Sequence, residues 1–405
     1  MKLRDFKAFH FAEIELRPLT VFVGENNSGK SSITAAIKLL AQTIQNPDST
    51  IPALFSGPFG DYGSYRDIVH NNHRARPFEI SITVPSRGTL DLRSARRRTA
   101  GSDVCLRSEF KYRTGRRETV LQSSTLSVDG RSIIGMERKK DADRPSVTML
   151  DGKPVLADDR TALRGFLMTR NFIPRLRPYA VSEESTSAEL YRTIRKLDRL
   201  IRVSANSIDS ALASVESIGS MRVVPERTFV HSGVRNRRIG SAGENWGTLL
   251  ALGMSARSKD SYVDKVSAWL RSSGIAESIE VSWLSDRHFE ILIQHPITRE
   301  KENVFDVGRG TSHVLPVILG GYRLPRGSTY LVEEPESHLH PRAQAALGDF
   351  FADLIEQDVQ AIVETHSEYL LMRLQQHVAA GRIDPSSISI YYVNAEPDGK
   401  KNCTN

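Results

Sequence analysis

Residues 19–44, LTVFVGENNSGKSSITAAIKLLAQTI, decide the fold of this chain of 405 residues. The stretch opens with a short apolar, β-branched run at residues 19–23, which is typical of a buried parallel strand. Residues 24–31 then have the spacing G-x-x-x-x-G-K-S. Apolar residues follow at the intervals of one helix face: Ile33, Ile37, Leu40 and Ile44. A loop of this composition between a strand and a helix indicates a phosphate-binding loop.

The residue types in this loop suit a bound nucleotide. Gly24 and Gly29 let the backbone curl so that its N–H groups point inward, and the start of the following helix adds partial positive charge. Lys30 is expected to reach the β- and γ-phosphates, and the Ser31 hydroxyl to ligate Mg²⁺. No N-K-x-D motif of a GTPase occurs, so we expect ATP. The predicted nucleotide-binding residues of the loop are Gly24, Glu25, Asn26, Asn27, Ser28, Gly29, Lys30, Ser31 and Ser32.

A second stretch, TYLVEEPESHLHP at residues 329–341, places two adjacent carboxylates after an apolar strand. Burying unpaired charge is costly, so such a pair usually marks a partner or a site. We expect the strand at residues 330–332 to lie beside the loop strand. Glu333 would then face Mg²⁺, and Glu334 would act as the general base for the attacking water. The alternative is an exposed acidic turn after an edge strand.

Two further segments fit the same site. A strand at residues 361–363 leads into His366, which is expected to contact the γ-phosphate; the alternative is a histidine bonded to backbone at a helix start. The glycine-rich turn GRGTS, residues 308–312, precedes an apolar helix that is expected to begin near His313. One nucleotide does not need two helix N-termini, whereas two nucleotides held between two copies of the chain do. The sequence therefore predicts a homodimer.

These motifs together resemble a known family. The segments GENNSGKSS, DVGRGTSHVLP, YLVEEPESHLHP and ETHSEYLL occur in this order. They resemble ABC-type ATPases of the RecF, SMC and overcoming-lysogenization-defect (OLD) kind, a group that includes AAA-type ATPases of prokaryotic defence systems. The resemblance covers residues 1–80 and about 220–395. It implies an α/β P-loop fold like that of ABC ATPases, with a mostly parallel core sheet, an N-terminal antiparallel β subdomain and an inserted β and helical arm.

The resemblance also implies a role for each motif. Residues 24–31 correspond to Walker A, Glu333 to Walker B and Glu334 to the catalytic base, with Lys30 and His366 as further catalytic residues. Residues 337–340 correspond to the D-loop. Gly308, Gly310 and Ser312 correspond to the signature turn, which meets the γ-phosphate on the partner chain. Arg309 and His313 depart from the usual signature, and Glu333 replaces the commoner aspartate. Slow or partner-dependent turnover would follow from these departures.

The middle of the chain is basic, and the net charge is +7. The segments VCLRSEFKYR and TVLQSSTLSV suggest antiparallel strands. The basic side chains could bind nucleic acid, contact an acidic protein or form a solvated face, and all three remain open. They are Arg87, Arg93, Arg96, Arg97, Arg98, Arg107, Lys111, Arg113, Arg116 and Arg117. A helical stripe follows at Leu190, Ile194, Leu197 and Ile201, for which a packing face is the expected use.

The predicted segments are residues 1–85 and 226–405 for the two parts of the ATPase domain, 86–160 for the basic β-rich insertion and 161–225 for a helical insertion. No apolar run suits a membrane helix, no signal peptide is evident, and two cysteines support neither disulfides nor a thiolate metal site. We therefore expect a cytoplasmic protein without a membrane partner.

The segment after His366 is too short for the TOPRIM nuclease domain of OLD proteins, so any nuclease or toxin activity is expected on a separate effector chain. The leading hypothesis is an ATP-dependent switch for such an effector in anti-phage defence. A RecF-like DNA repair ATPase and a nucleotide-bound scaffold with little turnover are the alternatives.

Overall fold

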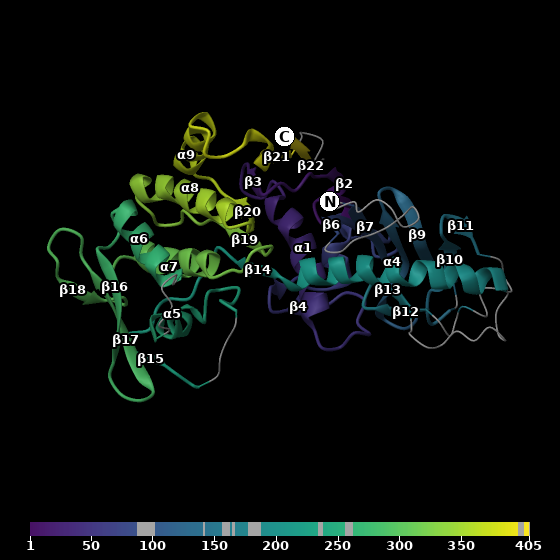
Figure 1. The fold of residues 1–405 in the computed structure, drawn as a ribbon, viewed down its shortest axis with the longest axis horizontal. Coiled ribbons are helices and arrows are strands. Elements are labelled where there is room, and N and C mark those ends of the chain that lie inside the picture. Colours follow the sequence, from purple (N-terminus) through teal and green to yellow (C-terminus); the bar gives the residue numbers. More distant parts are fainter. Residues whose placement is uncertain are drawn as a thin grey trace. The chain divides into compact units, whose positions relative to one another are not determined.

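The computed structural model describes residues 1–86, 102–140, 142–155, 163, 167–176, 188–233, 238–255, 262–395 and 401–404 (Figure 1). The chain divides into two compact units. The first unit comprises Met1–Ile14, Ser32–Ala213 and Ala395–Asn402, and the second comprises Glu15–Ser31, Ser214–Asn394 and Cys403–Asn405. The four segments predicted from the sequence remain a prediction, because the units follow contacts rather than chain order.

The first unit is built on an eight-stranded antiparallel sheet with the order β11-β10-β9-β8-β7-β6-β1-β2. The predicted antiparallel pair in the insertion is confirmed as β7 and β8. β6 pairs with both β1 and β7, so the N-terminal strands and the inserted strands form one continuous sheet. The strands are β1 Lys2–Phe6, β2 Phe9–Glu13, β6 Phe78–Pro85, β7 Asp103–Arg113, β8 Glu118–Val128, β9 Arg131–Glu137, β10 Ser146–Leu150 and β11 Lys153–Pro154.

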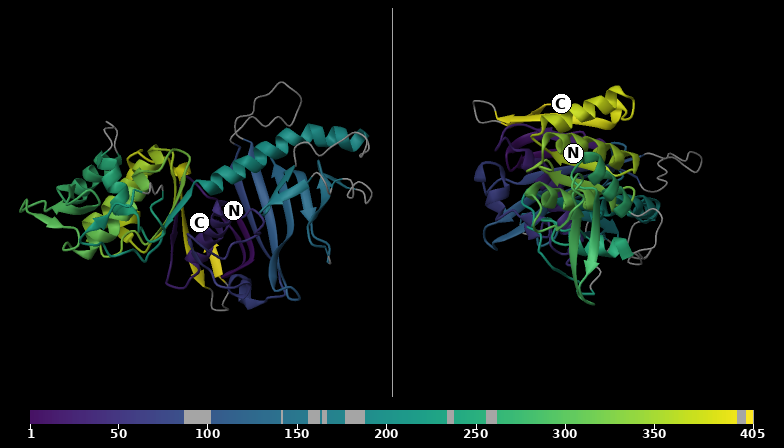
Figure 2. Two further views of the ribbon diagram at one scale, coloured as in Figure 1. Left: turned by 90° about the horizontal axis from the view of Figure 1, so that it is seen from below. Right: turned by 90° about the vertical axis from the view of Figure 1, so that its left-hand side faces the viewer.

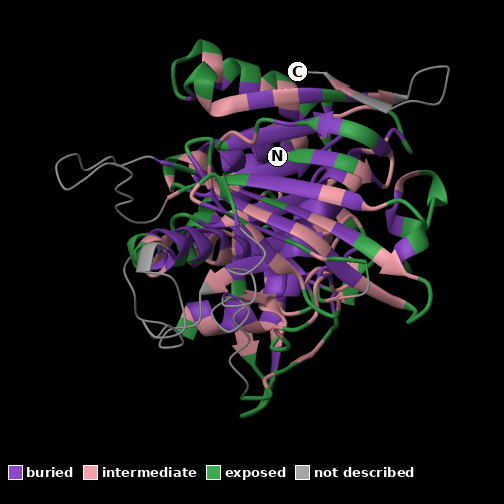
Figure 3. Cartoon of the chain, turned by 90° about the vertical axis from the view of Figure 1, so that its right-hand side faces the viewer, coloured by how far each residue is buried: buried purple, intermediate pink, exposed green. Residues whose placement is uncertain are grey.

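Helix α4, Ala188–Ala213, packs on this sheet along β6, β7, β8 and β9. The predicted apolar stripe is buried there, which confirms an ordinary packing face: Leu190, Ile194, Leu197 and Ile201. Figure 3 colours the chain by burial and shows long buried segments in the strands. The other elements assigned here are α1 Lys30–Gln45 from residue 32 onward, β4 Ser56–Gly57, β5 Gly60–Asp61, α2 Tyr65–Ile68, η1 His70–Asn72, and the hairpin β12 Leu167–Arg170 with β13 Ile173–Leu176.

The second unit contains the predicted parallel core sheet, with the order β14-β19-β20-β3-β21-β22. The pairs β14–β19, β19–β20, β20–β3 and β3–β21 are all parallel, which confirms the predicted fold class. The strands are β3 Leu19–Val23, β14 Val215–Ile218, β19 Thr329–Glu333, β20 Gln360–Glu364, β21 Ile388–Ala395 and β22 Lys401–Thr404.

One sequence expectation about this sheet is wrong. The strand at residues 330–332 does not lie beside the loop strand, because β20 lies between β19 and β3. Both β19 and β20 are short, buried, apolar strands. Strands buried on both faces read alike in sequence, so the apolar pattern does not specify which of them is central.

Helices and a smaller sheet complete the second unit, and Figure 2 shows them from two further directions. β17 pairs antiparallel with β15, β16 and β18. The core joins the parallel strands to these helices through large apolar side chains such as Trp246, Phe350 and Phe351. The elements are β15 Phe229–Val230, α5 Trp246–Ser255, α6 Tyr262–Ser273, β16 Ser278–Trp283, β17 His288–Gln294, β18 Lys301–Asn303, α7 Arg309–Tyr322, α8 Pro341–Glu356, α9 Glu368–Ala379 and η3 Pro385–Ser387.

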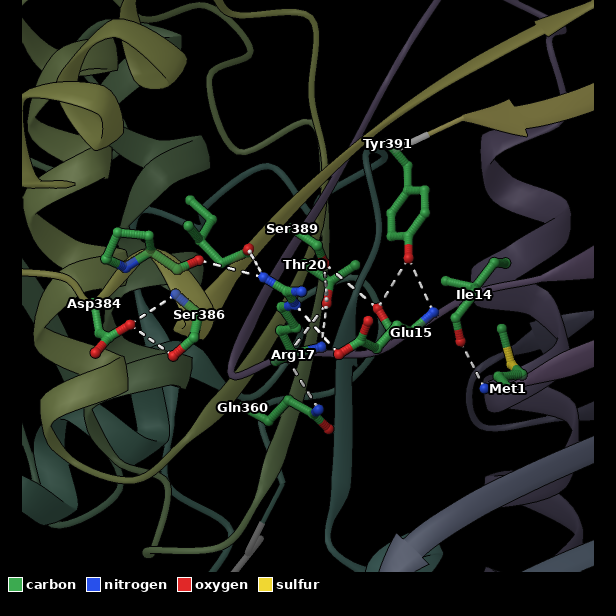
Figure 4. Close-up of polar contacts among 12 residues, drawn as sticks. Met1, Ile14, Glu15, Arg17, Thr20, Gln360, Asp384, Ser386, Ser389 and Tyr391 are labelled. Carbon is green, nitrogen blue, oxygen red and sulfur yellow. Dashed lines mark hydrogen bonds and ion pairs between the residues drawn. The ribbon is translucent and has the colours of Figure 1, made fainter.

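Polar contacts fix the amino end of β3 to its neighbours (Figure 4). Arg17 donates from its Nη1 atom to the carbonyl oxygens of Pro385 and Ile388, at 3.3 and 3.1 Å. The carbonyl oxygen of Arg17 accepts from Nε2 of Gln360 at 3.1 Å, and the backbone N–H of Glu15 donates to the Tyr391 hydroxyl at 2.9 Å. Because β3 is held to β20 and β21 at this end, the loop at its opposite end starts from a fixed strand.

Candidate functional site

The predicted phosphate-binding loop lies between β3 and α1, as expected. Its backbone needs glycine at the first position, because Gly24 has φ +144° and a Cβ built there would lie 2.1 Å from the carbonyl oxygen of Val393. Gly29 also has a positive φ, at 111°. Glu25, Asn26 and Asn27 are exposed at the tip of the loop. The conformation is therefore available only to a glycine-bearing loop.

Lys30 and Ser28 point into the structure rather than to solvent. The Lys30 ammonium donates to the carbonyl oxygens of Gly24 and Glu25, both at 2.8 Å. Burial lowers the pKa of Lys30, whereas Glu364, Glu334 and Glu336 act to raise it. The Ser28 hydroxyl is buried and makes no hydrogen bond. A buried polar atom without a partner in a curled glycine loop fits a ligand that brings its own acceptors.

Ser31 contacts a carboxylate that the sequence analysis gave no role. Its hydroxyl donates to Oε2 of Glu364 at 2.8 Å, and Glu364 is only 3% exposed. Glu364 ends β20, next to the loop strand. A signal for it exists in the sequence, since LVEE and IVET both end an apolar strand in glutamate. The sequence alone does not tell which of the two glutamates lies next to the phosphate-binding loop, because this depends on the order of the strands in the sheet.

The two predicted catalytic glutamates follow directly on β19. Glu333 is the last residue of that strand, and its Oε2 atom would lie 3.6 Å from a Cβ built on Gly219. Glu334 has φ +45°, in the left-handed region that non-glycine residues rarely occupy. Its backbone N–H donates to the carbonyl oxygen of Glu364 at 2.8 Å. Glu334 is therefore held in an unusual conformation beside the strand that carries Glu364.

His366 lies one residue before the N-cap of α9, where the Ser367 side chain accepts from the Leu370 N–H. The His366 backbone N–H donates to Oε1 of Glu336 at 2.6 Å, and its side chain is exposed. The Ser367 hydroxyl donates to Gln344 at 2.7 Å. His366 is thus bonded through its backbone to Glu336, two residues after Glu334, and the cap residue Ser367 is bonded to Gln344 of α8.

The predicted signature turn differs from expectation. Helix α7 begins at Arg309 with Gly308 as its N-cap, so residues 309–312 are the first helical turn and not a loop before His313. A Cβ on Gly310 would lie 2.5 Å from the carbonyl oxygen of His338. The glycine is therefore required by close packing rather than by a turn. Ser312 is buried, and its hydroxyl donates to the Arg309 carbonyl at 3.0 Å.

The basic insertion is only partly covered by the structure. Five predicted basic side chains lie outside the described residues: Arg87, Arg93, Arg96, Arg97 and Arg98. Three others have acidic partners: Arg107 with Glu79 at 2.7 Å, Arg113 with Glu118 at 3.4 Å, and Arg116 with Asp143 at 2.5 Å. Part of the positive charge in the described strands is therefore matched locally.

Two family models match parts of the chain. A model described as "AAA domain, putative AbiEii toxin, Type IV TA system" matches residues 189–373, and one described as "AAA ATPase domain" matches residues 1–84. The chain carries an AAA-type ATPase domain. Both halves of the site lie inside these matches, with the phosphate-binding loop in the first and Glu333, Glu334, Glu364 and His366 in the second. No match was found among curated proteins.

Solved structures similar to this chain include three SMC heads. One is an Smc head bound to the C-winged helix domain of ScpA, with 14% identity and a TM-score of 0.49, covering 100% of this chain and 95% of that chain. The SMC head domain from Thermotoga maritima has 15% identity and a TM-score of 0.39, with coverages of 100% and 96%. An Smc head with an extended coiled coil, bound to the C-terminal domain of ScpA derived from Pyrococcus furiosus, has 12% identity and a TM-score of 0.46, with coverages of 100% and 94%.

Among the described residues of the chain, no helix is long and apolar enough to cross a membrane. Nor does this part of the chain hold a group of three or more His, Cys, Asp or Glu side chains arranged to bind a metal ion.

Proposed function

We propose that the chain is a Mg²⁺-dependent ATPase whose ATP-bound homodimer acts as a switch for a separate effector, such as a nuclease or toxin, in defence against phage. The proposal of ATPase activity is supported by the residues that meet at the carboxyl edge of the parallel sheet. The phosphate-binding loop leaves β3 there, and the buried Glu364 of the next strand accepts a hydrogen bond from the loop residue Ser31.

The side chains at this edge fit a nucleotide-bound magnesium ion. Mg²⁺ in such sites is held by one or two carboxylates, a hydroxyl, water and substrate phosphates, and so needs no closed protein cage. Ser31, Glu333 and Glu364 would hold it on the protein side. When bound, the ion neutralises charge on the β- and γ-phosphates. We add Glu364 to the two predicted metal-side residues, Ser31 and Glu333, because Glu364 is buried and is hydrogen-bonded to Ser31.

The remaining residues would bind the phosphates and activate water. The Lys30 ammonium would exchange its carbonyl partners for phosphate oxygens, with the loop N–H groups around it. Glu334 would accept a proton from the water that attacks the γ-phosphorus, forming a new P–O bond as the bond to ADP breaks. His366 would contact the γ-phosphate from the start of α9. In a dimer, the first turn of α7 would approach the nucleotide of the partner.

The switch role is supported by a family description. The family model that matches residues 189–373 carries AbiEii and a toxin–antitoxin system in its description. We favour this role over one in DNA repair because Arg107, Arg113 and Arg116 of the basic insertion have acidic partners. Binding of ATP between two chains would stabilise only the closed dimer, so hydrolysis would release it.

Phosphate release by the purified protein with ATP and Mg²⁺ tests the proposal. Glu334→Gln keeps the side-chain length and removes the base, so the turnover rate should fall by about 100-fold or more. ATP binding should persist, and light scattering should show more dimer with ATP in the variant than in the wild type. Glu280→Gln is the control, since Glu280 pairs with Lys301 on the surface. Equal phosphate release by the wild type and E334Q would refute the assignment.

A further inference from the structure

Arg222 is a buried arginine whose hydrogen bonds to the described residues all go to backbone carbonyls. It lies between β14 and β15 and is 6% exposed. Its Nη2 atom donates to the carbonyl oxygens of Glu333 and Glu334, at 2.5 and 2.9 Å. Its Nε atom donates to Gly219 at 3.1 Å, and its Nη1 atom to the His313 carbonyl at 3.5 Å. One guanidinium therefore joins three segments that are far apart in sequence.

This arrangement is unusual for a buried cation. Burial lowers the pKa of Arg222, while Tyr330, Glu336, Glu334 and Glu333 act to raise it. A buried charge is costly unless it is paired with an opposite charge. The same unit shows the ordinary solution at Arg323, whose Nη2 atom bonds to both carboxylate oxygens of Glu216 at 2.8 Å. Arg222 instead directs its planar set of donors at carbonyls, which fixes backbone positions.

The backbone that Arg222 fixes is the strained one. Glu334 has φ +45°, and a non-glycine residue keeps such a conformation only when its surroundings determine it. Two bonds do so, since its N–H donates to Glu364 and its carbonyl accepts from Arg222. We infer that Arg222 is a positioning residue: it sets the direction of the Glu334 carboxylate and ties it to α7 through His313. This goes beyond the proposed function and relies on it only for the task given to Glu334.

Arginine-to-lysine substitutions provide the test. Arg222→Lys keeps the positive charge but replaces the planar set of donors, spread over three nitrogen atoms, with a single nitrogen atom. Its matched control is Arg227→Lys. Arg227 lies five residues after Arg222, is exposed and pairs with Asp306. In R222K the kcat of ATP hydrolysis should fall about 100-fold, the cost of a small misplacement of a catalytic group, with KM changed less than about threefold. R227K should match the wild type.

Two further readouts separate positioning from general damage. If Arg222 acts through Glu334, adding R222K to E334Q should leave the residual rate within about twofold. Amide hydrogen exchange should accelerate about tenfold or more in the peptide covering residues 331–339 of R222K, while the core peptide of residues 343–354 exchanges as in the wild type. R222A serves as the larger deletion if R222K retains its bonds.

The outcomes distinguish this inference from the proposed function. A further 100-fold loss in the double variant, or unchanged exchange at residues 331–339 in both R222K and R222A, would overturn the role of Arg222. A wild-type protein that releases no phosphate would count against the proposed function. The exchange measurement would still decide the inference, because it needs no turnover.

Discussion

Glu333 and Glu364 are direct Cα partners across the parallel pair β19–β20, so two neighbouring strands end in carboxylates at the same edge of the sheet. Adjacent strands are about 4.8 Å apart, and like charges at that spacing repel each other unless a cation offsets them. A divalent ion bound with the nucleotide would supply that charge. The relationship joins the predicted metal-side residue to one that the sequence analysis had left without a role.

Glu364→Gln should therefore shift the magnesium dependence of ATP binding. The amide keeps the size and one acceptor oxygen but loses the charge next to Ser31. We expect the apparent Mg²⁺ affinity in the presence of a fluorescent ATP analogue to fall roughly 10- to 100-fold, with binding in EDTA little changed. Glu368→Gln is the control, an exposed residue in the first turn of α9. The same Mg²⁺ midpoint in E364Q and wild type would exclude the metal-side role.

Gly24→Ala should disrupt the phosphate-binding loop. The added Cβ would meet the carbonyl oxygen of Val393 at 2.1 Å, and φ +144° is strained for any other residue. Strain of about 1–3 kcal/mol corresponds to a roughly 5- to 150-fold loss of ATP affinity if the loop must deform to accept it. Gly115→Ala, at an open position of the first unit, should bind ATP normally. Calorimetric titration with ATP measures both, and wild-type affinity in G24A would contradict the loop geometry.

Substitutions at Glu336 should separate its hydrogen bond from its charge. Oε1 accepts the His366 N–H at 2.6 Å, while Oε2 is buried without a hydrogen bond. Glu336→Ala leaves that N–H without its acceptor, which costs about 1–3 kcal/mol of the free energy of unfolding. Glu336→Gln keeps an acceptor and should cost less. Urea unfolding of the two variants tests this, and equal losses would show that the bond to His366 contributes nothing.

The stability of the protein should depend on pH through His313. Burial lowers the pKa of His313 from its usual value of 6.5, and Arg222, His338 and Arg309 lower it further. The unfolded chain then binds more protons than the folded chain just below pH 6.5, so stability is complete above that pH and declines as the pH falls towards the folded pKa.

His313→Gln removes this titration and should flatten the dependence of the unfolding free energy on pH below 6.5. Urea unfolding at several pH values measures the slope. His340→Gln offers a comparison at an exposed histidine, the N-cap of α8. If the unfolding free energy of H313Q and of the wild type has the same slope against pH, the lowered pKa of His313 does not affect the stability of this protein.

The sequence was sufficient to predict the elements of the site because local patterns identify them. The glycine spacing predicted the loop, the helical spacing predicted α1, and the apolar runs before Glu333 and Glu364 predicted β19 and β20. It could not predict the strand order, since equally apolar parallel strands do not identify their neighbours. It placed the start of α7 too late, because Gly310 reads as a turn when its glycine is needed for close approach to His338. The role of Arg222 could not be predicted, because its carbonyl partners come from distant segments and leave no sequence pattern.

The two carbonyl bonds of Lys30 have a kinetic consequence. They hold the curled loop with its own side chain, so the loop would not have to fold around an incoming triphosphate. Binding would then lose little ordering entropy, and association could approach the rate of a rigid site. Exchange of ADP for ATP would be set by how fast ADP leaves rather than by how fast the loop forms.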